Sequence, residues 1–350
     1  MLIKSLASLA GVAVVAGALG LGGQPVKAQT PAEFYDDNVI TVLIAFRPGG
    51  GFHLYSSVLS EHMRKRIPGK PKILLQFMPG AGGLKAANYF YHVAPKDGSY
   101  LSLLSQTAAL FQRLNKGHSK AIRYDASKFE YIGRLVSMDA AHMFYKSIKN
   151  RDLGKLKGTD GTVIACTSGK AAQGYINAKA LAVASGINVK ILTGYQGSRA
   201  QNLAMQQGEC NYQPGAWNSW KARRGDWLKQ GLIKPMAITA LTRHPDLPDT
   251  PTIVELAKND TDRDIMKFIA GYAAVGRAYS APPGTPKDRV AALRKAFDGM
   301  VNDPVFIADA KKRKMLLGPG TGAEVQKVVD DIISTPEAVV LNARKMLGYK

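Results

Sequence analysis

Four glycine-containing loops have the residue types and spacing to bind a ligand. They lie at residues 48–51, 79–83, 167–169 and 194–198, each after a short apolar run and before an amphipathic stretch. Glycine lets the backbone approach a ligand closely, and the free N–H groups at the start of a helix attract anions. Four loops in matching positions favour binding of a carboxylate or phosphate by main-chain donors. Any one of them alone is more often just a tight turn.

Enzyme motifs are scarce in the same sequence. The six histidines form neither an H-x-x-x-H pair nor an H-E-x-x-H motif, so no metal site is predicted. The run Gly80-Ala81-Gly82 resembles the start of a dinucleotide fingerprint, but Lys85 stands where the final glycine should be. We therefore predict neither a cofactor nor catalytic residues. The alternative is a secreted α/β hydrolase in which Ser168 and His53 would act as nucleophile and base.

The segments around the loops alternate between strand and helix patterns. Apolar runs at residues 39–44, 72–77 and 100–104 read as strands, and a second block repeats the plan with strands at 162–165 and 189–192. Alternating strands and helices indicate parallel sheets with helices on their faces. Ligands bind such sheets at the carboxyl ends of the strands. We therefore predict an α/β protein with two lobes, whose loops meet at a cleft.

The remaining segments complete the predicted organisation. Pro214-Gly215 reads as a turn, and the chain from residue 286 onward reads as helical. Crossovers between the lobes are expected near residues 134–145 and 270–279. The predicted division is lobe one at residues 29–133 and 272–350, and lobe two at residues 134–271.

The first 28 residues have the pattern of a secretory signal peptide. Lys4 supplies a positive charge, residues 6–21 form a short apolar core, and residues 26–28 resemble a cleavage site. Four glycines crowd the end of the apolar stretch, which disfavours the alternative of a membrane anchor. We expect cleavage near Ala28 and an exported chain. Outside the cytoplasm, Cys166 and Cys210 could either form a disulfide or remain as two buried thiols.

Composition excludes several classes of protein. The 350 residues carry a net charge of +21, or +19 once Lys4 and Lys27 are removed, and 46% of them are hydrophobic. That apolar share excludes a mostly disordered chain, and two cysteines exclude a small disulfide scaffold. The basic stretch with Trp217, Trp220 and Trp227 has the mixture found in binders of single-stranded nucleic acid. We expect instead a solvated helix with buried tryptophans, and no nucleic acid as partner.

Six segments resemble the Bug family, the extracytoplasmic receptors of tripartite tricarboxylate transporters. The first three are IAFRPGGG at residues 44–51, FMPGAGG at 77–83 and APKDGSYL at 94–101. The later three are TGYQGS at residues 193–198, LPDTPT at 247–252 and APPGTP at 281–286. They follow one another in the family's order from about residue 38 to the end of the chain.

This resemblance implies a periplasmic binding protein fold of type II, with a cleft between two parallel-sheet lobes. It further implies a non-catalytic, monomeric receptor that closes on a small organic carboxylate and delivers it to a membrane permease. No cofactor and no metal ion are expected. A receptor that senses the ligand without transporting it would have the same fold, so that alternative stays open.

The resemblance also assigns the ligand-binding residues. Lobe one would contribute Phe46, Arg47, Gly49, Gly50, Gly51, Phe52, Gly80, Ala81, Gly82, Gly83, Gln106 and Thr107. Lobe two would contribute Thr167, Ser168, Gly169, Tyr195, Gln196, Gly197, Ser198, Gly215 and Ala216.

Two arginines lie at or near positions where this sequence differs from the family pattern. Arg47 replaces the usual alanine of the first loop, and Arg199 follows a loop in which Gln196 replaces the usual lysine. An arginine can hold a carboxylate through two parallel hydrogen bonds. We hypothesise that Arg47 or Arg199 binds a ligand carboxylate; the alternative for each is an exposed cation.

Overall fold

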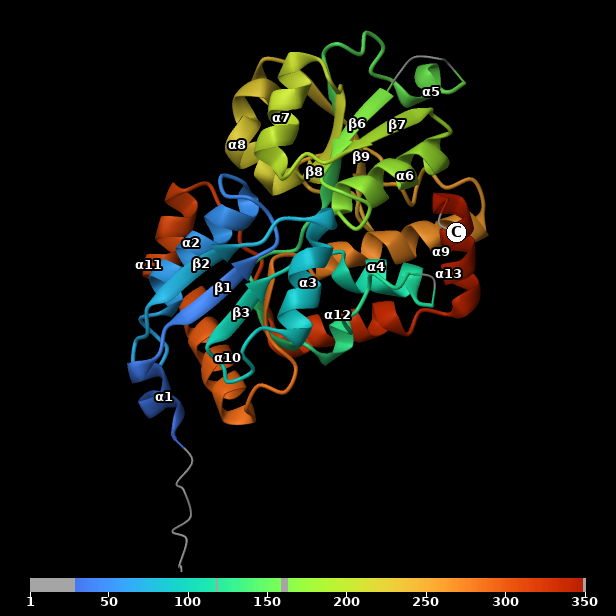
Figure 1. Cartoon of the computed structure of the whole chain (residues 1–350). Helices are drawn as coiled ribbons and strands as arrows, with labels where there is room; N and C mark the ends of the chain where they lie inside the picture. Colours follow the sequence, from blue (N-terminus) through green and yellow to red (C-terminus); the bar gives the residue numbers. More distant parts are fainter. Residues whose placement is uncertain (1–28, 118, 159–162, 349–350) are drawn as a thin grey trace, which may run out of the picture.

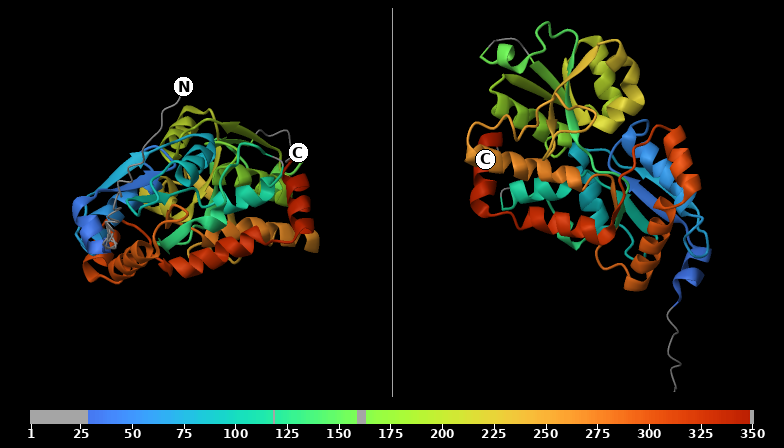
Figure 2. Two further views of the ribbon diagram at one scale, coloured as in Figure 1. Left: turned by 60° about the horizontal axis from the view of Figure 1, so that its bottom comes forward. Right: turned by 180° about the vertical axis from the view of Figure 1, so that it is seen from behind.

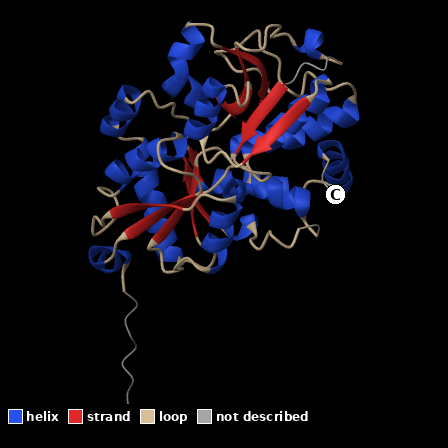
Figure 3. Ribbon diagram, turned by 45° about the horizontal axis from the view of Figure 1, so that its top comes forward, coloured by secondary structure: helices blue, strands red, loops and turns tan. Residues whose placement is uncertain are grey.

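Two sheets with flanking helices form the two halves of the protein (Figure 1). The structure is a computed structural model that describes residues 29–117, 119–158 and 163–348. The expected signal peptide, residues 1–28, lies outside the described residues. Figure 3 shows loops at the middle of the molecule, between the two groups of strands. Among the described residues, no helix has the length and apolarity needed to span a membrane.

The first sheet has the strand order β11-β4-β10-β3-β1-β2. Strand β1 pairs in parallel with β2 and β3, whereas β10 runs antiparallel to β3 and β4, and β11 is antiparallel to β4. The strands are β1 Ile40–Ile44, β2 Ile73–Phe77, β3 Tyr100–Leu103, β4 Glu130–Arg134, β10 Ala278–Ala281 and β11 Gly320–Thr321.

The second sheet has the order β7-β6-β8-β5-β9. Strand β6 is parallel to β7 and β8, and β5 is antiparallel to β8 and β9. The α/β fold prediction is confirmed, with a parallel core in each sheet and antiparallel strands added to it. The strands are β5 Ala140–Tyr145, β6 Val163–Thr167, β7 Val189–Thr193, β8 Tyr212–Ala216 and β9 Ile233–Thr239.

The predicted turn at Pro214-Gly215 is wrong, because both residues lie inside β8. Strand β8 meets β6 only through the pair Ala165 and Tyr212. Beyond Tyr212, no strand of the described residues lies beside this edge of β8. A proline there removes no ladder hydrogen bond, so the usual rule that proline ends a strand does not apply.

Helices cover the sheets and form most of the described chain from residue 286 onward, as expected, but the short strand β11 interrupts them. In the first part of the chain they are α1 Pro31–Asp37, α2 Gly51–Met63, α3 Leu84–His92, α4 Ala108–Asn115 and α5 Leu153–Leu156. The middle part holds α6 Gln173–Ser185, α7 Ser198–Gln207, α8 Trp217–Lys229 and α9 Asp260–Ala270. The last part holds α10 Lys287–Val301, α11 Pro304–Lys312, α12 Gly322–Ile333 and α13 Glu337–Leu347. Short 3-10 turns lie at Ala81–Gly83, Ala126–Lys128 and Gly271–Ala274.

The chain crosses between the sheets twice, and the two crossovers run side by side. It leaves the first sheet after β4 and returns to it at β10. The N–H of Leu135 donates to the carbonyl of Arg277 (3.0 Å), and the N–H of Arg277 donates to the carbonyl of Val136 (2.9 Å). Helix α13 contacts both α4 and α6, at the end of the molecule seen in Figure 2. The lobe limits drawn from the sequence stay a prediction.

The two cysteines form a disulfide, which decides the alternative that the sequence leaves open. Cys166 lies in β6 and Cys210 just before β8, with Cα atoms 5.9 Å apart. Both side chains are buried in the apolar cluster that also holds the three tryptophans of α8. The disulfide therefore fixes the start of β8 to the end of β6, next to the loop predicted at residues 167–169.

Candidate ligand-binding site

A cavity of about 110 Å³ lies between the loops of the two sheets. It is large enough for several water molecules or a small organic molecule, since one water needs roughly 10–15 Å³ by this measure. Eleven of the residues expected from the sequence line it. They are Phe46, Arg47, Gly50, Gly51, Phe52, Gln106, Ser168, Gly197, Ser198, Gly215 and Ala216.

The other expected residues are not among those that line the cavity. They are Gly49, Gly80, Ala81, Gly82, Gly83, Thr107, Thr167, Gly169, Tyr195 and Gln196. Several of them hold the two halves together. A Cβ added at Gly169 would lie 2.7 Å from the backbone nitrogen of Gly82, so these two loops touch through their main chains. The hydroxyl of Thr107 donates to the carbonyl of Ala171 (2.8 Å) across the same contact. Tyr195 instead donates its hydroxyl to Glu209 (2.6 Å).

Four helices begin at the cavity without a capping side chain. The residues that precede α2, α6, α7 and α8 are Gly50, Ala172, Gly197 and Ala216, and all four line the cavity. None of the four helices has an acidic residue in its first turn. Of the other described helices, α3, α4, α10 and α13 also lack a side-chain cap. Five have one, which comes from Thr30, Asp152, Asn259, Asp303 or Thr321. Free N–H groups and the positive ends of four helix dipoles therefore surround the cavity.

Four arginines and no carboxylate are found among the described residues that line the cavity. The arginines are Arg47, Arg223, Arg224 and Arg277. Arg223 donates from Nη2 to the carbonyl of Gly50 (2.8 Å) and from Nη1 to that of Gly49, which joins α8 to the loop before α2. Burial, with Arg224 beside it, lowers the pKa of Arg223. The cavity is thus strongly positive.

Several polar side-chain atoms at the cavity have no hydrogen-bond partner within the described chain. The acceptors are Gln106 Oε1, Asn202 Oδ1 and Gln213 Oε1; the donors include Trp220 Nε1 and Arg277 Nε and Nη1. Buried polar groups are rarely left unpaired in proteins. A polar ligand would give such groups their partners.

Comparison with known proteins identifies relatives in sequence and in fold. No family model matches the chain. A UPF0065 protein encoded in the gbd 5′ region of Cupriavidus necator is 23% identical over 303 residues, which cover 85% of this chain and 84% of the relative. Another, from the tcbD–tcbE intergenic region of Pseudomonas sp. strain P51, is 22% identical over 337 residues, covering 94% and 92%.

Solved structures agree with these relatives. The periplasmic binding protein BugD superposes with a TM-score of 0.69 at 20% identity, covering 90% of this chain and 99% of its own. MatC from Rhodopseudomonas palustris with bound malate has a TM-score of 0.66 at 20% identity, covering 87% and 99%. A further R. palustris protein, with adipate, has a TM-score of 0.67 at 18% identity, covering 89% and 98%.

The chain is similar in sequence to UPF0065 proteins and shares the fold of BugD. The resemblance indicated by the six sequence motifs is therefore confirmed. BugD is a periplasmic binding protein. The UPF0065 relatives align over most of the chain.

The polar lining residues that the sequence did not point to come in equal numbers from α8 with the crossover before β10 and from other elements. They are Ser219, Trp220, Arg223, Arg224 and Arg277, with Ser105, Gln173, Gln201, Asn202 and Gln213 from other elements. The position of α8 could have indicated its role, because its tryptophans and arginines directly follow the carboxyl end of a strand, where ligands bind such sheets. The tryptophans are buried, as expected, but one face of α8 lines the cavity.

The pair of residues that a hydrolase would need is not assembled in this Bug-type fold. The hydroxyl of Ser168 accepts a hydrogen bond from Gln201 Nε2 (3.1 Å), and Gln201 in turn accepts one from Gln213 (2.7 Å). The Nδ1 atom of His53 accepts from the N–H of Gly49 (3.1 Å), and its ring packs edge-on against Phe77. Each group has a structural partner of its own, so the arrangement does not favour the hydrolase alternative.

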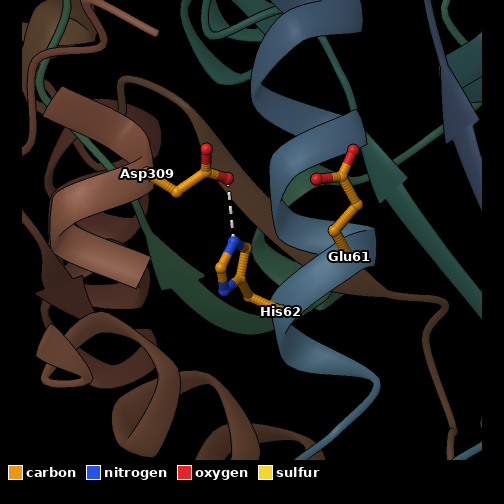
Figure 4. A group of neighbouring side chains, drawn as sticks. All are labelled: Glu61, His62 and Asp309. Atoms are coloured by element: carbon orange, nitrogen blue, oxygen red, sulfur yellow. Dashed lines mark hydrogen bonds and ion pairs between the residues drawn. The ribbon is translucent and has the colours of Figure 1, made fainter. Parts of the chain in front are cut away.

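One group of metal-ligating residue types lies apart from the cavity, between α2 and α11 (Figure 4). His62 Nε2 lies 2.9 Å from Asp309 Oδ2, and Glu61 projects from the same helix as His62. Arg313 forms ion pairs with both carboxylates, Asp309 and Glu61. Because both carboxylates are already paired, we interpret this group as an ion-pair network that holds α11 against α2.

Proposed function

We propose that this protein is a periplasmic receptor that captures a small organic carboxylate between its lobes. In this proposal the closed, loaded form delivers the ligand to a permease of the tripartite tricarboxylate type. The observation that carries the proposal is the convergence of four uncapped helix starts on a cavity with arginines and no carboxylate in its described lining. An anion of small size is the ligand that fits this arrangement.

A carboxylate is favoured over other anions by what similar proteins bind. MatC holds malate, and the second R. palustris protein holds adipate; both ligands are dicarboxylates. The main-chain donors of the loops, together with Arg223 and Arg277, offer the charge-assisted hydrogen bonds that carboxylates accept. Gln106, Asn202 and Gln213 could accept hydrogen bonds from hydroxyl groups of the ligand.

Lobe closure is supported by the contacts that cross the cavity. Arg223 of α8 holds the carbonyls of Gly49 and Gly50, and Gln106 donates to Gln173 on the other side of the cavity. These contacts must break for a ligand to enter, and the paired crossovers are the place where the chain can bend. A ligand that bridges the two halves binds the closed form more tightly than the open form. It stabilises the closed form by the difference between these two binding free energies.

The test is a binding screen with the mature chain. Malate and adipate are titrated by calorimetry and compared with their uncharged diamides. We expect saturable binding of at least one acid, a rise in melting temperature, and no binding of the diamides. Small-angle scattering should show a smaller radius of gyration with ligand than without it. If neither these acids nor a wider panel of mono-, di- and tricarboxylates and amino acids binds, the receptor proposal is wrong.

Delivery to a permease has its own test. Uptake of the radiolabelled acid identified in the screen is measured in the native host and in a strain that lacks the gene. Loss of uptake, restored by the gene in trans, supports transport. Unchanged uptake by the deletion strain, with binding intact, would favour the alternative of a ligand-sensing receptor.

A further inference from the structure

Arg277 is a buried cation whose charge no group of the described chain neutralises. Its exposure is 3%, and it lies in the crossover just before β10. Its Nε and Nη1 atoms have no hydrogen-bond partner. Burial lowers the pKa of its guanidinium to about 10, and Arg223 nearby acts in the same direction. Tyr55 and Tyr279 favour its charged form, and no carboxylate is found among the described residues that line the cavity with it.

Packing holds this guanidinium in place at the cavity. Its central carbon lies 3.7 Å from the centre of the Phe52 ring and 5.9 Å from that of Tyr55. The backbone of Arg277 is fixed by hydrogen bonds to Leu135 and Val136 of the other crossover. The side chain therefore needs little reorganisation to meet a ligand, which is the condition for an effective binding group.

The absence of a side chain at Gly51 leaves room around Arg277 Nη2. A Cβ at this position would lie 3.1 Å from that atom and 2.8 Å from the hydroxyl of Ser219. The backbone of Gly51 is not in the left-handed region, so its conformation does not require glycine. Glycine therefore suits position 51 because any side chain would fill the space beside the guanidinium. Gly51, Ser219 and Arg277 all line the cavity.

We propose that Arg277 is the specificity-determining residue for a second anionic group of the ligand, so that the protein selects dicarboxylates over monocarboxylates. The inference rests on the proposed function and deepens it. One carboxylate binds at the helix starts, and the other pairs with Arg277 in the water-excluded part of the cavity. An unpaired buried cation destabilises a protein, and a dianionic ligand removes that cost on binding.

The experiment compares each dicarboxylate with its own monoamide, which has the same length and one charge fewer. Succinate and adipate are titrated into the wild-type chain and into Arg277→Gln, alongside succinamate and adipamate. We expect the wild type to prefer a diacid over its monoamide by roughly 30-fold or more, and Arg277→Gln to lose most of this preference. Affinity for the monoamides should change less than threefold. Equal preference in the two proteins would overturn the proposal.

A second measurement separates a ligand-binding arginine from a structural one. Arg277→Met keeps the apolar contact with Phe52 and Tyr55 but removes the charge. Because burial of that charge is offset by the aromatic contacts alone and by no carboxylate, we expect the ligand-free melting temperature to stay the same or rise. A clear fall, together with an unchanged preference for diacids, would show that Arg277 serves the fold. Arg64→Gln, on the exposed end of α2, is the matched control and should alter neither property.

Two failures can be told apart. If the wild-type chain binds no carboxylate at all, the proposed receptor function is wrong. If it binds monoamides and diacids equally well, the receptor function stands and only the role of Arg277 is wrong.

Discussion

The guanidinium of Arg277 is stacked on the ring of Phe52, with 3.7 Å between its central carbon and the ring centre. Phe52 belongs to the first turn of α2, and Arg277 belongs to the crossover between the sheets. This contact connects the first turn of α2, which lines the cavity, with the crossover at which the chain is expected to bend. Any movement of the crossover must therefore carry the guanidinium past, or along with, the start of α2.

This stacking should be measurable as a coupling between the two residues. Phe52→Leu keeps an apolar side chain but removes the aromatic face, so we expect the free energy of unfolding to fall by about 1–2 kcal/mol. In the Arg277→Met background the same substitution should cost clearly less. Chemical denaturation of the four proteins of this double-mutant cycle gives the coupling energy. A coupling near zero would show that the cation and the ring do not stabilise each other.

The disulfide should contribute strongly to stability. It closes a loop between residues 44 positions apart, and both sulfur atoms are buried. We expect Cys166→Ala/Cys210→Ala to lower the free energy of unfolding by about 2–4 kcal/mol. Urea denaturation with and without reductant checks this. Reductant should destabilise the wild type to a similar extent and leave the double variant unchanged; an effect of reductant on the variant would point to another cause.

Buried His142 should make stability depend on pH. Its ring nitrogens are hydrogen-bonded to the hydroxyls of Tyr212 (2.6 Å) and Thr239 (2.8 Å), and burial lowers its pKa to about 3. The unfolded chain protonates a histidine near pH 6.5, whereas the folded chain does not. Stability is therefore complete above pH 6.5 and is lost as the pH falls toward 3, at about 1.4 kcal/mol per pH unit.

Urea denaturation at pH 7 and pH 5 tests this expectation. The wild type should lose about 2 kcal/mol between the two values. His142→Gln should lose much less, while His92→Gln, at an exposed site, should behave like the wild type. An equal loss in His142→Gln and the wild type would assign the pH dependence to other groups.

The contact between the two glycine loops should control closure. Gly169 has no left-handed backbone, but a Cβ there would meet the main chain of Gly82 at 2.7 Å. We expect Gly169→Ala to hold the lobes apart and to weaken binding of the ligand roughly tenfold, because overpacking costs about 1–3 kcal/mol. Scattering should show a larger radius of gyration. Gly225→Ala, where nothing lies within 4 Å, is the control; unchanged binding by Gly169→Ala would contradict this account.

Arg47 and Arg199, the two arginines of the sequence hypothesis, lie in different places. Arg47 lines the cavity but is exposed, and Arg199 is exposed and is not part of the lining. We expect Arg47→Gln to slow association of a dicarboxylate a few-fold at low salt and to leave dissociation nearly unchanged. At high salt the difference should vanish. Stopped-flow tryptophan fluorescence can follow both rates, because one of the three tryptophans, Trp220, lines the cavity. A dissociation rate raised tenfold or more would instead show that Arg47 holds the ligand directly.

The parts of the site that sequence could reveal are those with local signals. Glycine loops between strand and helix patterns pointed to residues such as Gly51 and Gly197, because parallel sheets gather such loops at one edge. The role of α8 was harder to see, since Arg223 and Trp220 fit equally well on a solvated helix. Arg277 has no local signal at all. Its burial depends on Phe52 and Tyr55, which only the tertiary fold brings to it.

The disulfide between β6 and the start of β8 also shapes how the protein can be made. The sequence contains two cysteines, so oxidation within one chain has a single possible product. Correct pairing needs no reshuffling, but it must wait until Cys210 has been synthesised and has reached an oxidant. Material produced in a reducing cytoplasm would keep free thiols beside the loop at Ser168. Preparations from the two compartments should therefore be compared before any affinity is assigned.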